Sequence, residues 1–356
     1  MKVANIIAGL GAGGAESSLN LLGNYASKQK NTSWDVFSLS NEISSNFELK
    51  NKKFNLKSFL LPFNFLLLAM ELKKIKYNKY FFWMYDAAFI SIFLFPMLNC
   101  KPNWYIHHNL LNFKNESIKL KTQTKILSLI SHTFFVEKIF FASKNSMNLH
   151  IKKLKFNSKK CVYCPIGFDE EKFIFKPPTE EKILKIGNFG RFSKVKNHQF
   201  LFNLCKKLKD REVDFELHLA GIGMEKKNTL LLDMLKKSEL CNETFLYGET
   251  QDIPNLYRNI DLYILCSLSE AFPLVIGESL LTGIYAISNE LGDVGEMIKL
   301  NGKIIKNLDK DEYVNAIDQF VKMSEEKKIF IADANRKFIA NNFSVENQLN
   351  TLLSTN

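Results

Sequence analysis

Short apolar runs alternate with amphipathic stretches along most of the chain. The runs in the first half are almost wholly apolar, as buried strands of a parallel sheet are. The first amphipathic stretch, which follows the apolar run 3–8, places Leu19, Leu22 and Ala26 on one helical face. This alternation predicts a parallel sheet wrapped by helices. The predicted strands of the first half are 3–8, 34–39, 81–85, 103–107 and 139–142.

The same pattern starts again after residue 182. Between the two halves, the segment 169–182 is charged and contains Pro177 and Pro178, which is typical of a linker. In the second half, Gly283 is expected to end a helix. The predicted strands of this half are 183–191, 215–223, 244–250 and 261–266.

A chain of 356 residues exceeds what one hydrophobic core usually supports. We therefore expect two Rossmann-like, doubly wound α/β domains, 1–168 and 183–335, joined by the linker 169–182. A C-terminal helix, 336–356, can pack back on the N-terminal domain. In such sheets, ligands bind outside the carboxyl ends of the strands.

The net charge of +11 is concentrated in lysine blocks, with seven Lys and no acidic residue over 138–160. Such blocks suit anionic lipid headgroups or an acidic substrate, and a solvated helix face stays an alternative. Nucleic acid is not an expected partner, because the blocks contain almost no Arg and no known reading module. The apolar run 80–98 contains Asp86 and Pro96, and we interpret it as a buried strand followed by a helix rather than a membrane span. We expect attachment to a membrane surface instead.

The six cysteines are scattered, and the N-terminus has no signal-peptide pattern. Cys161 and Cys164 form one CxxC motif, but a zinc site needs two more ligands at matching spacing, and none is nearby. We therefore expect reduced thiols, no metal, and a cytoplasmic protein.

The glycine-rich stretch GLGAGGAE, residues 9–16, follows the first predicted strand. The spacing of Gly9, Gly11 and Gly14 satisfies a dinucleotide fingerprint and would indicate an oxidoreductase. That function also needs an acidic residue about 20 residues after the glycines. Glu42 lies 28 residues after Gly14, in polar sequence, so we favour another function.

Two glutamates flank a predicted helix start in the segment 267–283. Pro273 fits the first turn of the helix, Glu270 precedes it, and Glu278 lies about a turn inside it. Free backbone amides at such a start form an anion site that suits a diphosphate, and the carboxylates can bind hydroxyls on either side. A diphosphate with hydroxyls on both sides describes a nucleotide sugar.

This segment resembles the E-x7-E region of retaining GT-B glycosyltransferases, in particular family four, with the usual form S-x-x-E-G-F-P-L-x-x-x-E-A. Ala271 and Ser279 replace the usual Gly and Ala. The stretches 187–202, 219–223 and 291–298 resemble the G-R-x-x-x-x-K motif, the L-x-G-x-G strand end and the Gly-rich loop of the same family. GLGAGGAE resembles its G-L-x-x-G-G-A-E motif. The matching residues of the first segment are Ser267, Glu270, Phe272, Pro273, Leu274 and Glu278.

The resemblance implies roles for individual residues. Arg191 and Lys196 would neutralise the diphosphate leaving group, Glu270 would position the donor sugar, and His108 would lie near that sugar, with His107 as the alternative. Glu278 would bind the ribose hydroxyls. The resemblance also implies two domains that face a central cleft, and Gly14 is expected to tolerate a side chain least. The implied donor-binding residues are Gly13, Gly14, Gly190, Gly221, Phe272, Pro273, Leu274, Val275 and Glu278.

The expected function is that of a metal-independent retaining glycosyltransferase without a cofactor. It would move a sugar from a nucleotide diphosphate sugar, with a UDP-sugar favoured, to a hydroxyl of a lipid-linked glycan in O-antigen or capsule synthesis, on the inner face of the cell membrane. A GT-B-like sugar-nucleotide epimerase and a non-catalytic nucleotide-sugar-binding partner stay open. Ile166 and Tyr285 depart from the family pattern and weaken any transfer of donor identity.

Overall fold

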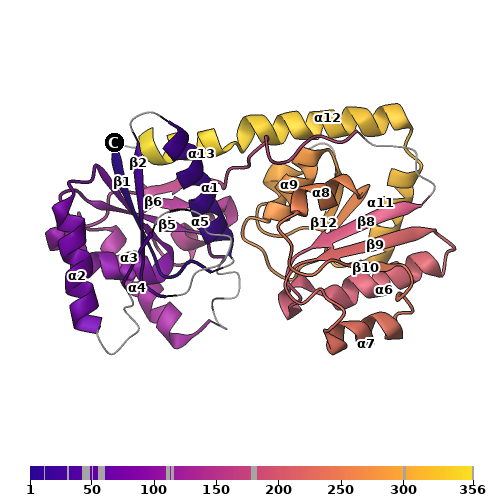
Figure 1. Cartoon of the computed structure of the whole chain (residues 1–356), viewed down its shortest axis with the longest axis horizontal. Coiled ribbons are helices and arrows are strands. Elements are labelled where there is room, and N and C mark those ends of the chain that lie inside the picture. The colour runs from indigo at the N-terminus through magenta and orange to yellow at the C-terminus, as the bar shows by residue number, and fades with distance from the viewer. Residues whose placement is uncertain are drawn as a thin grey trace. The chain divides into compact units, whose positions relative to one another are not determined.

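The chain folds into two compact units (Figure 1). Unit 1 comprises Met1–Gly167 and Val345–Asn356, and unit 2 comprises Phe168–Ser344. The computed structural model describes residues 1–11, 13–29, 32–41, 49, 51–54, 61–109, 113, 116–177, 183–299 and 302–354.

Within its described residues, unit 1 contains a seven-stranded parallel sheet of order β3-β2-β1-β4-β5-β6-β7. The predicted run 80–98 is confirmed as a strand and a helix, and the strand ends at Trp83. Met84, with a φ of 68°, turns the chain directly into the helix, which is why the strand is shorter than predicted. The strands are β1 (Lys2–Ile7), β2 (Ser33–Ser38), β3 (Asn51–Lys53), β4 (Lys79–Trp83), β5 (Pro102–Ile106), β6 (Ile139–Phe141) and β7 (Cys161–Tyr163).

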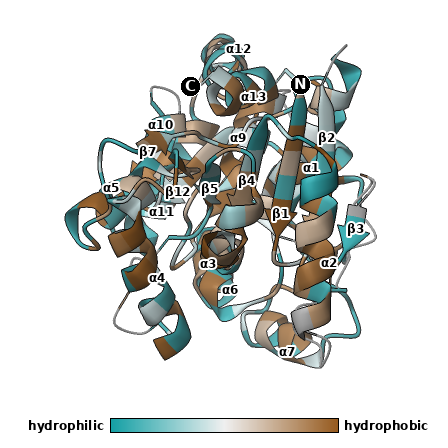
Figure 2. Ribbon diagram, turned by 90° about the vertical axis from the view of Figure 1, so that its left-hand side faces the viewer, coloured by the Kyte–Doolittle hydropathy of each residue, from teal (hydrophilic) through white to brown (hydrophobic). Residues whose placement is uncertain are grey.

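Helices cover the sheet of unit 1. The helix α3 packs on β4 and β5, α4 packs on α3, and α1 contacts α13. Figure 2 shows the hydrophobic colour over α3, whose buried apolar residues belong to the core around Phe82, Trp104 and Ile106. The helices are α1 (Gly14–Lys28), α2 (Leu61–Lys74), α3 (Met84–Leu94), η1 (Phe95–Met97), α4 (Ile118–Ser131), α5 (Lys144–Lys152) and α13 (Val345–Ser354).

The helix α13 is tied to unit 1 through Gln348, whose side chain is buried. Its Nε2 donates to Ser18 Oγ and to Tyr105 OH, both at 2.8 Å. Its Oε1 accepts from the Gly167 N–H at 2.8 Å. One amide therefore satisfies polar groups from a helix, a strand and the end of the first chain segment.

Unit 2 has a parallel sheet of six strands in its described part, of order β10-β9-β8-β11-β12-β13. Both units thus have the expected doubly wound α/β fold. The strands are β8 (Leu184–Phe189), β9 (Phe215–Ala220), β10 (Thr244–Leu246), β11 (Leu262–Leu265), β12 (Tyr285–Asn289) and β13 (Lys303–Ile305).

The helices of unit 2 form two layers. Figure 1 shows α6 and α7 on one side of β9 and β10, and α8 and α9 on the other. The helix α11 packs against α6, and α12 packs against α9. The helices are η3 (Lys194–Lys196), α6 (His198–Lys209), α7 (Thr229–Lys237), α8 (Ile253–Arg258), α9 (Leu274–Thr282), α10 (Val294–Met297), α11 (Lys310–Val321) and α12 (Glu325–Asn342).

The unit boundaries differ from the predicted domain boundaries. Residues 169–177 belong to unit 2, where Phe173 is buried and the Lys176 N–H donates to Thr282 O at 2.8 Å. The sequence did not indicate this anchoring, because the charged residues and prolines of the segment are typical of a linker. Residues 178–182 lie outside the described residues. The region 336–356 is not one helix, because α12 ends at Asn342 in unit 2 and α13 begins at Val345 in unit 1.

Candidate functional site

Two loops of unit 2 start at the point where the strand order of the sheet reverses. The first strand of the unit, β8, has β9 on one side and β11 on the other. In doubly wound sheets, ligands bind at such a switch point, outside the carboxyl ends of the strands. The predicted residues 190–196 follow β8, and the predicted residues 270–275 follow β11.

The loop after β8 is held by close backbone contacts. The Gly190 N–H donates to Ala220 O at 2.7 Å. Gly221 has a φ of 131°, and a Cβ there would lie 2.4 Å from Gly190 O, so the loop after β9 needs glycine at this approach. Asn197 adopts a left-handed conformation with a φ of 56°, and its Nδ2 donates to Cys266 O at 3.2 Å. These contacts fix the turn that carries Lys196 against the end of β11.

Lys196 and Glu270, predicted separately, form an ion pair. Lys196 Nζ lies 2.7 Å from Glu270 Oε1, and Ser267 Oγ donates to the same oxygen at 2.9 Å. The two side chains are only 21% and 17% exposed. Asn289 at the end of β12 donates from Nδ2 to Ser267 O at 2.9 Å and thus supports the loop. An incoming diphosphate would compete with Glu270 for the ammonium group.

Arg191 lies in the same loop as Lys196 but has a different environment. Its side chain is exposed and makes no hydrogen bond or ion pair within the part of the chain that the structure describes. A guanidinium in this state can bind an anion without first breaking a protein contact.

The start of α9 supplies backbone donors beside the ion pair. Pro273 is the N-cap, so the N–H groups of Leu274 and Val275 have no acceptor in a preceding helical turn. Phe272 is buried, and its ring stacks on Phe168 with centroids 6.0 Å apart, which anchors the loop. From the other side, a Cβ at Gly292 would lie 2.5 Å from the Glu270 backbone oxygen. The predicted residues therefore surround a helix N-terminus suited to an anion.

Glu278 lies on α9, one turn after these amides. Its Oε2 accepts a hydrogen bond from Tyr257 OH at 3.0 Å. Its Oε1 has no hydrogen-bond partner among the described residues and keeps access to solvent. Burial raises the pKa of Glu278, while the Tyr257 hydrogen bond and the charges of Lys172 and Lys196 oppose that rise.

In unit 1, the predicted glycines stand at the end of β1, where the sheet order again reverses. Gly13 is the N-cap of α1, and Gly14 is its exposed first residue. A Cβ at Gly13 would lie 2.4 Å from Glu16 Oε2, and burial raises the pKa of Glu16. Residue 12 lies outside the described residues.

The two candidate histidines follow β5. The ring of His107 packs against Trp83 and Tyr105, and neither ring nitrogen has a hydrogen-bond partner among the described residues. Burial lowers the pKa of His107 to about 3. Burial also lowers the pKa of His108, against the opposing charge of Glu116. Both rings are therefore neutral near physiological pH, and the role of His108 stays a prediction.

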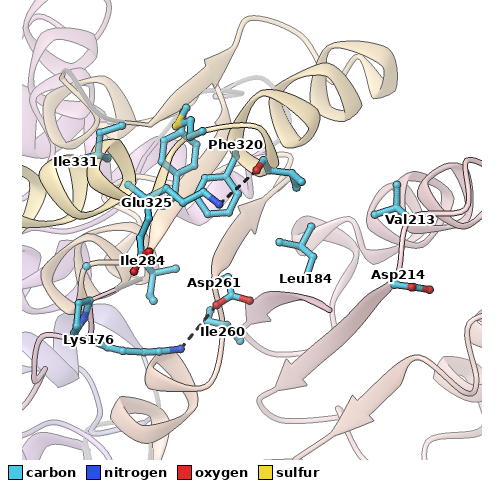
Figure 3. A pocket seen from close by; sticks show the side chains of 16 residues that line it. Lys176, Leu184, Val213, Asp214, Ile260, Asp261, Ile284, Phe320, Glu325 and Ile331 are labelled. Atoms are coloured by element: carbon cyan, nitrogen blue, oxygen red, sulfur yellow. Dashed lines mark hydrogen bonds and ion pairs between the residues drawn. The ribbon is translucent and has the colours of Figure 1, made fainter. Parts of the chain in front are cut away.

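A pocket of about 500 Å³ lies elsewhere in unit 2, at the amino ends of β8, β11 and β12 (Figure 3). Lys176 Nζ and Asp261 Oδ1 form an ion pair of 3.8 Å on its wall. None of its lining residues belongs to the predicted site. The pocket thus lies at the opposite ends of the strands from the switch-point loops.

Sequence reasoning assigned no individual role to several residues that build the site, although some of them lie in the motif stretches 187–202 and 291–298. Asn197 and Gly292 hold backbone conformations with positive φ, for which Asn and Gly in a loop are the usual signal. Tyr257 and Asn289 act through hydrogen bonds between elements, and residue spacing carries no signal for such contacts.

Comparison with known proteins shows which family this region resembles. Residues 169–337 match the family described as "Glycosyl transferases group 1". The chain is 30% identical over 210 residues to the UDP-Gal:alpha-D-GlcNAc-diphosphoundecaprenol alpha-1,3-galactosyltransferase of Escherichia coli. That match covers 55% of this chain and 53% of the relative, so the chain spans about half the length of this curated relative.

Two further similarities extend over most of the chain. A protein of Klebsiella pneumoniae described as an uncharacterized 41.2 kDa protein in the cps region is 24% identical over 80% of this chain and 81% of its own length. The crystal structure of Anabaena Alr3699/HepE in complex with UDP matches 100% of this chain and 99% of its own, with a TM-score of 0.83 and 17% identity. This structural likeness concerns the fold alone. Residues 169–337 thus match the glycosyl transferases group 1 family, and the chain has the GT-B fold.

Proposed function

We propose that this protein is a retaining, metal-independent glycosyltransferase that moves a sugar from a nucleotide diphosphate sugar to a hydroxyl of a glycan acceptor. The observation that carries the proposal is the Lys196–Glu270 ion pair at the N-terminus of α9, at the switch point of unit 2. Exposed Arg191, in the same loop as Lys196, adds a second cation.

The chemistry follows from where charge develops. When the bond between the sugar and the diphosphate breaks, negative charge grows on the phosphate oxygens, and fixed cations and amides stabilise it most in the transition state. Arg191, Lys196 and the amides of α9 would supply this stabilisation. Once Lys196 turns to the phosphate, Glu270 is released to accept a hydrogen bond from a hydroxyl of the donor sugar. In the retaining reaction implied by the family, the acceptor hydroxyl arrives on the face that the diphosphate leaves.

The roles that remain predictions are part of the same proposal. Glu278 would bind the ribose hydroxyls through its solvent-accessible Oε1. In unit 1, Gly13 and Gly14 would allow close backbone approach to a ligand, and His108 would lie near the donor sugar.

The relatives favour a UDP-sugar and a lipid-linked acceptor. HepE has been crystallised with UDP and with UDP-glucose, and the name of the Escherichia coli relative contains UDP-Gal and a diphosphoundecaprenol-linked sugar. Other relatives are named for O-antigen biosynthesis. We infer by analogy that this chain acts in the synthesis of a bacterial surface polysaccharide.

The surface of α2 supports attachment to the inner face of the cell membrane. Phe63, Leu66 and Met70 are 56%, 51% and 51% exposed and follow one another at helical spacing. Lys73 and Lys74 end the same helix, so an apolar stripe meets positive charge, as in helices that lie on anionic bilayers. Within the described residues, no helix has the length and hydropathy of a transmembrane span.

Liposome sedimentation tests the membrane proposal. The wild-type protein should sediment with phosphatidylglycerol vesicles, and the triple variant Phe63→Ser, Leu66→Ser, Met70→Ser should stay in the supernatant. Phe330→Ser, which removes a 70% exposed aromatic residue from unit 2, is the matched control and should sediment normally. A wild-type protein that ignores these vesicles would contradict the proposal.

Activity measurements test the transferase proposal. Screening UDP- and GDP-sugars by thermal shift identifies the donor. Lys196→Ala and Glu278→Ala should then each lose transfer while staying folded, whereas Lys194→Ala, in the same short helix but exposed, should keep it. Full activity in both site variants would refute the assignment. Donor conversion without acceptor would instead indicate an epimerase, and binding without turnover a non-catalytic partner.

A further inference from the structure

The hydroxyl of Tyr257 lies within hydrogen-bond distance of the Glu278 carboxylate. Tyr257 belongs to α8, and its OH lies 3.0 Å from Glu278 Oε2 and 3.1 Å from the Val275 backbone oxygen. The hydroxyl has one proton to give, and a charged acceptor binds it more strongly than a carbonyl does. The carboxylate is therefore the favoured acceptor.

The ring of Tyr257 is held rigidly, so its hydroxyl has a defined position. The residue is fully buried, and its ring packs against Phe189, Tyr263 and Phe173 with centroids 4.9, 5.8 and 5.9 Å away. A buried ring in such a cluster has little freedom to turn its hydroxyl elsewhere. The hydrogen bond fixes Oε2 and leaves Oε1 of Glu278 for a ligand.

The charged and titratable groups around Glu278 come from several elements. Tyr257 and Tyr263 face it from α8 and β11, Lys196 from η3, and Lys172 from the segment before β8. The two lysines act only through their charge, whereas Tyr257 donates a direct hydrogen bond. Loss of that bond would leave a largely buried carboxylate with weaker support for its charged form.

We propose that Tyr257 is the positioning residue that holds Glu278 as an oriented carboxylate for the ribose hydroxyls of the donor, an inference that rests on the proposed function. Tyr257 does not touch the reacting atoms. Tyr257 affects donor binding only through Glu278.

Tyr257→Phe tests this inference because it keeps the buried ring and removes only the hydroxyl. A hydrogen bond to a charged group corresponds to roughly a tenfold or larger change in affinity, so the variant should bind UDP-glucose at least about tenfold more weakly near neutral pH. Without the bond, the pKa of Glu278 rises further, so binding should weaken at a higher pH than in the wild type. Calorimetric titrations with UDP-glucose from about pH 5 to about pH 8 measure both effects.

Two variants serve as controls. Tyr263→Phe removes another buried hydroxyl of the same cluster, which is hydrogen-bonded to the backbone of Phe189, and should keep the wild-type pH dependence of binding. Glu278→Gln should lose the part of the pH dependence that belongs to Glu278. Circular dichroism and thermal unfolding check that each variant is folded.

The outcomes separate this inference from the proposed function. If Glu278→Gln binds like the wild type at every pH, the proposed role of Glu278 fails. If Glu278→Gln loses binding but Tyr257→Phe keeps the wild-type affinity and pH dependence, only the inference fails. A uniform loss at all pH values together with lower thermal stability would also overturn it, because that is the pattern of a structural role.

A measurement on the free protein does not depend on the donor. Carbon-13 NMR titration of glutamate carboxyls, with Glu278→Gln identifying the signal, should show a higher pKa for Glu278 in Tyr257→Phe than in the wild type. An unchanged pKa would overturn the inference even if UDP-glucose is not the donor.

Discussion

His198 is a buried histidine without a hydrogen bond. It is 3% exposed, its ring lies between Phe192 and Phe202, and neither nitrogen has a partner among the described residues. Burial and the nearby charge of Lys196 lower its pKa from the ordinary 6.5 to about 4. The ring therefore stays neutral in the folded protein at pH values at which the unfolded chain is protonated.

This difference makes unit 2 sensitive to acid. Because the pKa of His198 is lower in the folded protein than in the unfolded chain, its contribution to the free energy of unfolding is fully present above pH 6.5. This contribution is lost as the pH falls toward 4. At about pH 5 the loss from this residue is about 2 kcal/mol, and His198→Phe should abolish it. Urea unfolding followed by circular dichroism at about pH 7.5 and about pH 5 measures it. Equal losses in wild type and variant would contradict the prediction.

At the residue scale, the sequence indicated candidate site residues but not the contacts between their side chains. Lys196, Glu270 and Glu278 were predicted because they match family motifs that contact a ligand, and their roles stay predictions. The structure shows Lys196 and Glu270 bound to each other, which a motif cannot predict because it records residues that meet a ligand. The contacts of Tyr257 and Asn289 were not predicted, because their hydrogen bonds join separate elements.

At the scale of elements, α9 depends on a glycine in its middle. A Cβ at Gly277 would lie 2.0 Å from Cζ of Phe168, a ring that also stacks on Phe272. Alanine usually stabilises a helix by about 1 kcal/mol relative to glycine. Here the collision with a packed ring should reverse the sign, because the core has no space for the added methyl group.

We predict that Gly277→Ala destabilises unit 2 by about 1 to 3 kcal/mol, measured by urea unfolding. Gly295→Ala is the matched control, since a Cβ there has no neighbour within 4 Å. Adding Phe168→Ala should make the effect of Gly277→Ala smaller, because the colliding ring is gone. A stabilised Gly277→Ala single variant would contradict the packing described for α9.

The regular elements were the easier part to predict. Mostly apolar runs identified β1, β4, β5, β8 and β11, because strands covered on both faces have a strong pattern. The short strand β3 lacks this pattern, because two of its three residues are lysines. The segment 169–177 resembled a linker because its charged residues outnumber its single buried anchor, Phe173.

At the scale of the whole molecule, α13 belongs to unit 1 although it follows unit 2 in sequence. Gln348→Leu would leave the Gly167 N–H and the Ser18 and Tyr105 hydroxyls without this partner. We predict that it destabilises unit 1 by about 3 kcal/mol, the cost of unsatisfied buried groups.

Tryptophan fluorescence can measure this destabilisation of unit 1. All three, Trp34, Trp83 and Trp104, lie in unit 1, so their fluorescence follows the unfolding of that unit. The fluorescence transition in urea should move to a lower concentration in Gln348→Leu and stay in place in Asn350→Ala, which alters an exposed residue of the same helix. An unmoved transition in Gln348→Leu would show that α13 is not needed for unit 1.

The path of the chain has a consequence for its synthesis on the ribosome. Unit 2 is an insertion between residues 167 and 345 of unit 1, so every residue of unit 2 is translated before α13 emerges. Domains usually fold in the order in which they are made. Here the unit that begins first must wait for the other, with Ser18 and Tyr105 lacking their partner until Gln348 leaves the exit tunnel.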